Sequence, residues 1–158
     1  MEVKREYYLN QLISHKHNGL IKIISGIRRC GKSYLLSELF RKHLLAEGVK
    51  EDHIIHIALD DYEKKQYRNP DNCYQYVKSS IKDDEMYYLL LDEVQMMDSF
   101  EDVLNGFLHI KNLDVYVTGS NSKFLSSDVV TEFRGRGDEI RVYPFSFAEF
   151  YSVIGGDW

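Results

Sequence analysis

The sequence predicts an α/β fold in which a parallel sheet lies between two layers of helices. Short apolar runs alternate with longer amphipathic stretches along the whole chain, which is typical of βα units. Only two prolines and ten glycines interrupt these stretches. The 158 residues are 44% hydrophobic, which is enough to bury the core of one domain.

Five strands are predicted from apolar runs bounded by glycine or by small polar and acidic residues. In chain order they span residues 20–25, 54–59, 87–91, 114–118 and 139–143. The third run is apolar at every position, as expected of a strand buried on both faces. Pro144 ends the fifth strand, because proline cannot donate to the ladder.

Helices are predicted where apolar residues recur at helical spacing. They span residues 2–14, 33–46, 72–81 and 99–110, and a short helix starts at Ser146. Gly48 lies just beyond the second helix as a stop signal. Ser99 with Asp102, and Ser146 with Glu149, have the spacing of capping boxes.

The net charge of −5 argues against broad nucleic-acid binding, but the charge is unevenly distributed. Residues 1–50 carry a net +6, residues 51–102 a net −9, and residues 103–158 a net −2. This distribution fits an anion site in the first third, with carboxylates for a cation from the middle third. The alternative is that most of these charges belong to solvated helix faces.

Targeting signals are not visible in the sequence. The charged N-terminus leads into no apolar segment of a secretory signal, and the longest apolar runs are far shorter than the ~20 residues needed to span a bilayer. Cys30 and Cys73 form no metal or disulfide pattern, which indicates free thiols. We therefore expect a cytoplasmic protein with no membrane partner.

A phosphate-binding loop is the strongest motif. Residues 26–33, Gly-Ile-Arg-Arg-Cys-Gly-Lys-Ser, match G-x-x-x-x-G-K-[ST] at every fixed position, between a predicted strand and a predicted helix. Backbone N–H groups of such a loop bind phosphate, Lys32 would reach the β- and γ-phosphates, and the Ser33 hydroxyl would ligate Mg²⁺. The alternative is a chance glycine turn beside a solvated lysine.

Two acids follow the buried third strand. Asp92 stands at the edge where open α/β sheets bind ligands, and would hold Mg²⁺ through water. Glu93 would be the base that polarises a water for attack on the γ-phosphate. Alone, such a pair is most often a strand ending in solvated acids. Together with the phosphate loop it predicts a nucleotide-hydrolysing site.

Further polar residues lie near the same edge. Ser120 or Asn121, after the fourth strand, would contact the γ-phosphate or the attacking water, and the alternative is a cap of the next helix. Arg134 and Arg136 flank Gly135 on a predicted exposed loop, which suits an arginine that reaches another molecule's nucleotide. Surface salt bridges are an equal alternative for these arginines.

Other charged residues and the histidines are less informative. Arg28 and Arg29 either add to the anion field of the loop or pair with acids after the second strand, such as Asp60. The six histidines predict no metal site, because His53 and His56 lie three apart on a predicted strand and so face opposite sides.

These motifs together resemble the AAA+ branch of P-loop ATPases, in particular the prokaryotic predicted ATPases that carry a further C-terminal domain of unknown function. The matching segments are 25–33, 90–95, 117–122 and 133–136, the last leading to 142–147. The resemblance implies a three-layer αβα core with a five-stranded parallel sheet in the order 5-1-4-3-2. It also implies that residues 26–33 and 90–95 hold the Walker A and Walker B motifs.

The resemblance further implies Mg²⁺-dependent binding and slow hydrolysis of ATP, with a homo-oligomer or an unknown protein as partner. ATP is favoured over GTP by the resemblance and because no Asn-Lys-x-Asp motif is present. The nucleotide-binding residues are expected to be Gly26, Ile27, Arg28, Arg29, Cys30, Gly31, Lys32, Ser33, Tyr34 and Ser120. The rival functions are a nucleotide-gated switch with little turnover and a small-molecule phosphotransferase.

Proteins of this kind normally continue into a helical lid and a C-terminal domain, whereas the chain ends soon after Pro144. We therefore expect residues 1–158 to form the nucleotide-binding core without those parts.

Overall fold

The computed structural model describes residues 2–26, 31–120 and 137–142, with side chains from Glu6 onward. The strands are β1 (Ile21–Ser25), β2 (Ile54–Ala58), β3 (Tyr87–Asp92), β4 (Leu113–Gly119) and β5 (Gly137–Arg141). The α-helices are α1 (Glu2–Ser14), α2 (Lys32–Tyr34), α3 (Arg41–Ala46), α4 (Pro70–Ser80) and α5 (Phe100–Phe107). A π-helix, η1 (Leu35–Phe40), and the 3₁₀ turns η2 (Glu51–His53), η3 (Tyr62–Arg68) and η4 (Val94–Met96) complete the order.

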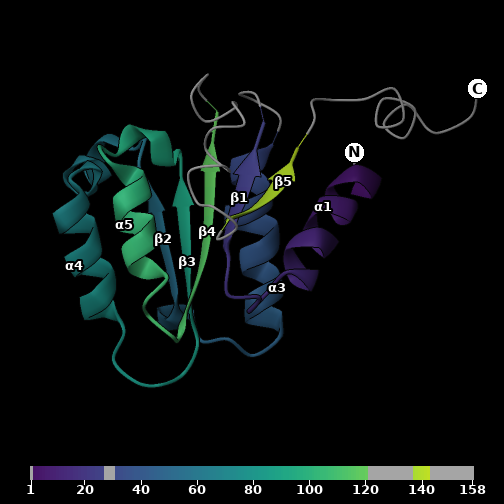
Figure 1. Cartoon of the computed structure of the whole chain (residues 1–158). Helices are drawn as coiled ribbons and strands as arrows, with labels where there is room; N and C mark the ends of the chain where they lie inside the picture. Colours follow the sequence, from purple (N-terminus) through teal and green to yellow (C-terminus); the bar gives the residue numbers. More distant parts are fainter. Residues whose placement is uncertain (1, 27–30, 121–136, 143–158) are drawn as a thin grey trace, which may run out of the picture.

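The five strands form one sheet in the order β2-β3-β4-β1-β5, and every neighbouring pair is parallel. This is the predicted order 5-1-4-3-2 counted from the other edge, so that prediction is confirmed. Figure 1 shows α4 and α5 on one face of the sheet and α1 and α3 on the other. The predicted three-layer arrangement is therefore confirmed.

Each face of the sheet has its own buried core, and β3 contributes to both. Leu89 and Leu91 pack toward α4 and α5, whereas Tyr88 and Leu90 pack toward α1 and the helix after β1. Successive strand residues point to opposite faces, so a strand covered on both sides needs apolar residues at every position. This explains the continuous apolar run that predicted the strand.

Two of the predicted helix boundaries differ by two residues or more, and one predicted cap does not form. Helix α4 starts at Pro70, two residues early, because the Asn69 side chain accepts hydrogen bonds from the next two N–H groups and proline fits the first helical position. Helix α5 ends at Phe107. The predicted capping box at its start does not form, because Ser99 has φ 52°, outside the extended region that side-chain capping needs.

The fifth strand lies two residues earlier than predicted. Its ladder pairs Ile21 with Gly137 and Ser25 with Arg141. The five residues of β1 thus pair with residues 137–141, and this pairing sets the bounds of β5. Val142 adds one further bond by donating its N–H to the Ser25 carbonyl over 2.7 Å. The polar residues of β5 fit because β5 is an edge strand. The helix predicted at Ser146, with its capping box, and Pro144 lie outside the described residues.

The helix after β1 runs from Lys32 to Ala46 with a π-helical segment in its middle. Four of its five buried side chains, Lys32, Leu36, Phe40 and Leu44, recur every four residues. A regular α-helix would rotate the last of these about 120° away from the first. The wider π turn reduces this drift and keeps the four side chains toward the sheet.

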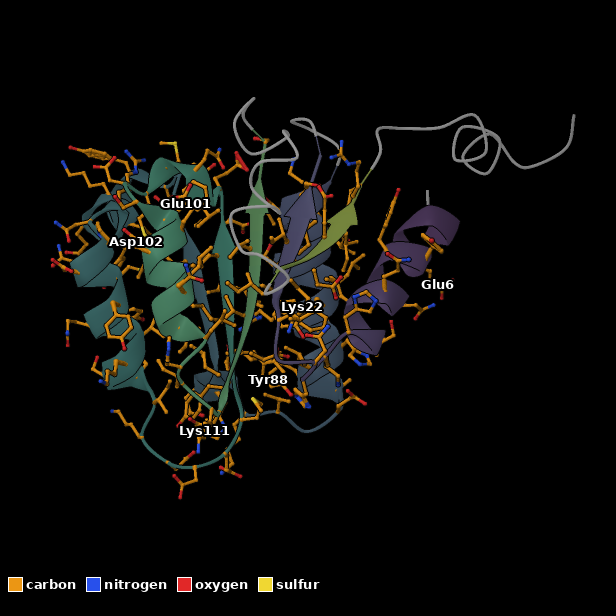
Figure 2. All side chains as sticks on the ribbon, in the orientation of Figure 1. Glu6, Lys22, Tyr88, Glu101, Asp102 and Lys111 are labelled. Carbon is orange, nitrogen blue, oxygen red and sulfur yellow. The ribbon has the colours of Figure 1, made fainter. Side chains whose placement is uncertain are left out.

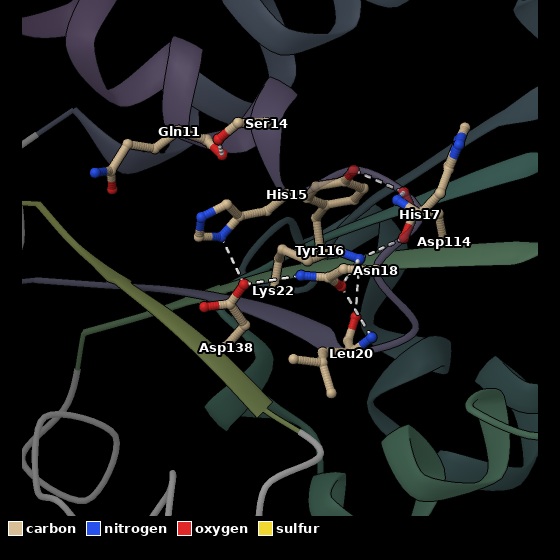
Figure 3. A network of polar contacts seen from close by, with 10 residues as sticks. All are labelled: Gln11, Ser14, His15, His17, Asn18, Leu20, Lys22, Asp114, Tyr116 and Asp138. Carbon is tan, nitrogen blue, oxygen red and sulfur yellow. Dashed lines mark hydrogen bonds and ion pairs between the residues drawn. The ribbon is translucent and has the colours of Figure 1, made fainter.

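A buried ionic network lies near the amino ends of β1 and β4 (Figures 2 and 3). Lys22 is fully buried and forms an ion pair with Asp114, which also accepts hydrogen bonds from the Tyr116 hydroxyl at 2.7 Å and the His17 N–H at 3.1 Å. His17 in turn bonds the Tyr88 hydroxyl at 2.7 Å. Burial, together with the Asp114 charge, raises the pKa of Tyr88 to about 12, so this hydroxyl stays protonated at neutral pH.

We expect Lys22→Met to lower the free energy of unfolding by about 3–5 kcal/mol, because it leaves the Asp114 charge buried without its partner. Urea unfolding followed by circular dichroism measures this. The exposed Lys111→Met is the surface control, and adding Asp114→Asn to Lys22→Met should recover part of the loss. A single variant as stable as the parent would show that the pair carries no such penalty.

Candidate functional site

The carboxyl ends of three strands, β1, β3 and β4, lie side by side and form one edge of the sheet. The ladder joins Ser25 of β1 to Gly119 of β4, and Leu91 of β3 to Val117 of β4. A cavity of about 400 Å³ at this edge is lined by Gly31, Lys32, Ser33, Tyr34, Asp60, Glu93 and Ser120. All but Asp60 are residues that the sequence assigned to the site. Ligands of open α/β sheets bind at this edge.

The described part of the predicted phosphate loop sits between β1 and the long helix. Gly31 has φ 89°, a left-handed conformation that glycine adopts without steric cost, and it directly precedes the helix. Lys32 is 5% exposed, and its ammonium donates a hydrogen bond to the Gly26 carbonyl at 2.8 Å. This bond closes the two ends of the loop on each other.

The Asp92 carboxylate is held from both neighbouring strands. Asp92 is 3% exposed, and its Oδ1 accepts a hydrogen bond from the Thr118 hydroxyl of β4 at 3.0 Å. Its Oδ2 bonds Nε2 of His56, on β2, at 2.9 Å. Since burying a carboxylate without partners is costly, these two bonds explain how Asp92 can be buried.

Glu93 directly follows β3, and its side chain lines the cavity. Its φ of 54° is uncommon for a residue with a side chain, and its N–H donates to the Thr118 hydroxyl at 3.0 Å. Its Oε1 accepts hydrogen bonds from the Ser120 hydroxyl at 2.7 Å and from the Gln95 amide at 3.0 Å. Thr118 therefore links both acids, while Ser120 contacts the second acid directly.

The family is decided by comparison of the sequence with protein-family models. Residues 18–151 match the model of a family described as AAA domain. The chain belongs to this AAA domain family. The match covers the phosphate loop, Asp92 and Glu93, and all five strands. It confirms the AAA+ P-loop ATPase core that the sequence motifs indicated.

Similar proteins have longer chains than this AAA domain. An uncharacterized protein of Haemophilus influenzae is 35% identical over 149 residues, which are 94% of this chain and 37% of that protein. An uncharacterized protein of Methanocaldococcus jannaschii is 31% identical over 134 residues, which are 82% of this chain and 28% of that protein. The chain thus spans about a third of the length of these relatives.

The fold of the AAA domain is also that of a solved structure, the ORC1 protein of Aeropyrum pernix in complex with DNA. The TM-score is 0.62 at 12% identity, over 95% of this chain and 48% of that one. At this identity the likeness concerns the fold alone, and it supports the three-layer AAA+ arrangement.

Some predicted site residues of the AAA domain lie outside the described residues: Ile27, Arg28, Arg29, Cys30, Asn121, Arg134 and Arg136. Sequence reasoning missed three side chains at the site: Asp60, Thr118 and His56. Thr118 stands one residue before Gly119, on the strand next to β3, and could have been found from the strand order. His56 was considered as a metal ligand and rejected, and the register of β2 against β3, which brings it to Asp92, has no sequence signal.

A larger cavity, of about 680 Å³, lies along the edge strand β2 of the AAA domain. Beside it, His53 is in the turn η2 rather than on the strand, which corrects the prediction. Its Nε2 lies 3.5 Å from an Asp83 oxygen and 3.7 Å from a Glu85 oxygen. The sequence, from which the histidines predict no metal site, gave no sign of this group of one histidine and two acids. We place the site at the smaller cavity, because the phosphate loop and Glu93 meet only there among the described residues.

Within the described ranges of the AAA domain, no helix has the length and apolar composition needed to cross a membrane.

Proposed function

We propose that this AAA domain binds Mg²⁺ and ATP at the edge formed by β1, β4 and β3, and that it hydrolyses the ATP slowly. The observation that carries the proposal is the meeting of Gly31 and Lys32 with Glu93 in one cavity, next in the chain to the buried Asp92. A phosphate needs N–H donors and a cation, and hydrolysis needs a carboxylate near the γ-phosphate. The cavity offers both.

Lys32 is the residue that we assign to the β- and γ-phosphates. Its ammonium bonds the Gly26 carbonyl in the structure, and this carbonyl is the partner that phosphate oxygens would replace. The positive charge of Lys32 thus lies at the cavity, at the start of a long helix. The N–H groups at the start of that helix favour an anion as well.

The donor set fits Mg²⁺, because Ser33 and Asp92 offer oxygen atoms and this ion is usually bound by few protein oxygens together with waters and phosphates. Ser33 lines the cavity, and Asp92 is the buried residue directly before the cavity-lining Glu93. We assign the ion to the Ser33 hydroxyl and, through water, to Asp92. When bound, the ion would neutralise charge on the phosphate oxygens.

Glu93 is the residue that we assign as general base. Among the described residues, both hydrogen-bond partners of its carboxylate bond Oε1, so we assign Oε2 to the attacking water. Ser120 orients the carboxylate through its 2.7 Å bond. Ser120 or Asn121 is the expected contact to the γ-phosphate.

Completion of the site by a second molecule is part of the proposal. Arg134 or Arg136 would supply positive charge to the nucleotide of another copy, which is a recurrent way to stabilise the transition state of phosphoryl transfer. Their glycine-flanked position supports this assignment. The partner would be another copy of the chain or an unknown protein.

A nucleotide-gated switch with little turnover is the second candidate. The observation in its favour is that the Glu93 carboxylate is already bonded to Ser120 and Gln95. In a switch, these two bonds would keep Glu93 from acting as a base until a partner protein breaks them.

The proposal is tested by calorimetric titration with ATP, with and without Mg²⁺, and by measuring ADP release over a range of protein concentrations. We expect Mg²⁺-dependent binding and slow ADP release without any added acceptor, with a specific rate that rises with concentration. Binding without turnover at every concentration would favour the switch. ADP release only with a small-molecule acceptor would favour a phosphotransferase, and absence of binding would refute the nucleotide site.

A further inference from the structure

The Asp92 carboxylate is held between its two neighbouring strands. Thr118 of β4 and His56 of β2 bond one oxygen each, at 3.0 and 2.9 Å. A carboxylate oxygen only accepts, so the ring nitrogen Nε2 of His56 carries the hydrogen in this bond. The two donors lie on opposite sides of β3 and together limit rotation of the carboxylate.

The strand register brings His56 to this position. Ala58 pairs with Asp92 and His56 pairs with Leu90, so the histidine stands two pairs further from the strand end, on the face where Asp92 also points. Ile54, on the same face of β2, belongs to the core beneath the helix after β1, whereas Ile55 and Ile57 belong to the opposite core. The long imidazole thus reaches the carboxylate from the edge strand.

The surroundings of His56 favour a role at the site over a purely structural one. His56 is on an edge strand, and a third of its side chain is exposed. A partly exposed ring contributes little to the core, whereas its bond to a buried carboxylate restricts a group that the proposed ion must use. Hydrogen bonds to the ligands of a metal typically change metal affinity or activity 10- to 100-fold.

We propose that His56 is a positioning residue for the magnesium site, which holds Oδ2 of Asp92 while Thr118 holds Oδ1. This inference rests on the proposed binding of Mg²⁺ and ATP. His56 touches neither nucleotide nor ion in this role, and it acts through the orientation of the carboxylate. Its loss weakens the Mg²⁺ dependence of ATP binding and leaves the affinity for Mg²⁺-free ATP unchanged.

The test compares His56→Gln with His56→Asn. The glutamine amide nitrogen is three bonds from Cβ, as Nε2 of histidine is, and can reach Asp92. The asparagine nitrogen is one bond shorter and cannot. ATP binding is measured by calorimetry at a series of Mg²⁺ concentrations, with kcat, KM and the free energy of unfolding measured for each variant. His109→Asn, on the exposed end of the α5 region, is the control.

We expect the Mg²⁺ concentration at half-maximal binding to rise about 10-fold or more in His56→Asn and to stay near that of the parent in His56→Gln. A loss of unfolding free energy in His56→Asn with an unchanged Mg²⁺ midpoint would overturn the inference and leave a structural role. A midpoint that falls would also overturn it, because the histidine would then compete with the ion.

The same titration separates this inference from the proposed function. A parent protein that binds ATP with no Mg²⁺ dependence, or does not bind it, refutes the magnesium site itself, and the inference falls with it. A parent with normal Mg²⁺ dependence and a His56→Asn variant that matches it refutes only the role of His56. If His56→Asn does not fold, His56→Ser in its place gives the same comparison with His56→Gln.

Discussion

Lys32→Ala is expected to abolish measurable binding of Mg²⁺ and ATP. Each hydrogen bond from an ammonium to a phosphate contributes about 1.5–3 kcal/mol, so loss of two such bonds weakens affinity by roughly 10²- to 10⁴-fold. Calorimetric titration measures the loss directly. Lys42→Ala, at an exposed position of the same helix, is the matched control and should bind as the parent does.

The structure changes one detail of this expectation. The sequence assigned Lys32 to the phosphates alone, yet its side chain is 5% exposed and bonds the Gly26 carbonyl. We therefore expect Lys32→Ala to lower the free energy of unfolding by about 1 kcal/mol while the domain stays folded. Unaltered affinity in a folded variant would contradict the assignment of the loop.

Glu93→Gln is expected to reduce turnover by about 10²- to 10⁴-fold, the usual contribution of a positioned general base, while ATP still binds. The glutamine carbonyl can keep the bond from Ser120, so the shape of the site is conserved while the basic oxygen is lost. A phosphate-release assay under single-turnover conditions measures the rate. Glu63→Gln, an exposed acid on η3, is the control.

Asp92→Asn separates the two acids, because it should weaken the Mg²⁺ dependence of binding rather than the chemical step. The Glu93→Gln variant should keep the Mg²⁺ midpoint of the parent. Equal turnover in Glu93→Gln and the parent would remove Glu93 from the mechanism and would favour a switch in which the acid only contacts Ser120.

Much of the fold could be predicted because it depends on local patterns. The uninterrupted apolar run of β3 and the glycine-rich loop between β1 and its helix are both visible in the sequence. The strand order came from the resemblance to AAA+ ATPases and is confirmed. Boundaries were less accurate where a partner decides them, as at β5, whose start is set by pairing of Gly137 with Ile21.

The candidate site was predictable only in part, for a related reason. Lys32, Ser33 and Glu93 belong to short motifs, so their meeting at one cavity could be expected. The bond between His56 and Asp92 joins residues 36 positions apart and depends on strand register, which no local pattern encodes. Ser99 is a similar case, because its sequence context indicates a cap while its backbone conformation prevents one.

The π-helical segment Leu35–Phe40 has a consequence for how this chain can vary in length. A π turn is equivalent to one residue inserted into an α-helix, with the extra residue accommodated by a wider ring. Deletion of one residue there would let the helix close with ordinary i to i−4 bonds, while Lys32 at one end and Leu44 at the other keep their relative orientation. The same deletion in α3 would turn the following residues by about 100° and take Leu44 out of the core. Within this helix, a lost residue is therefore better tolerated in the π-helical segment than in α3.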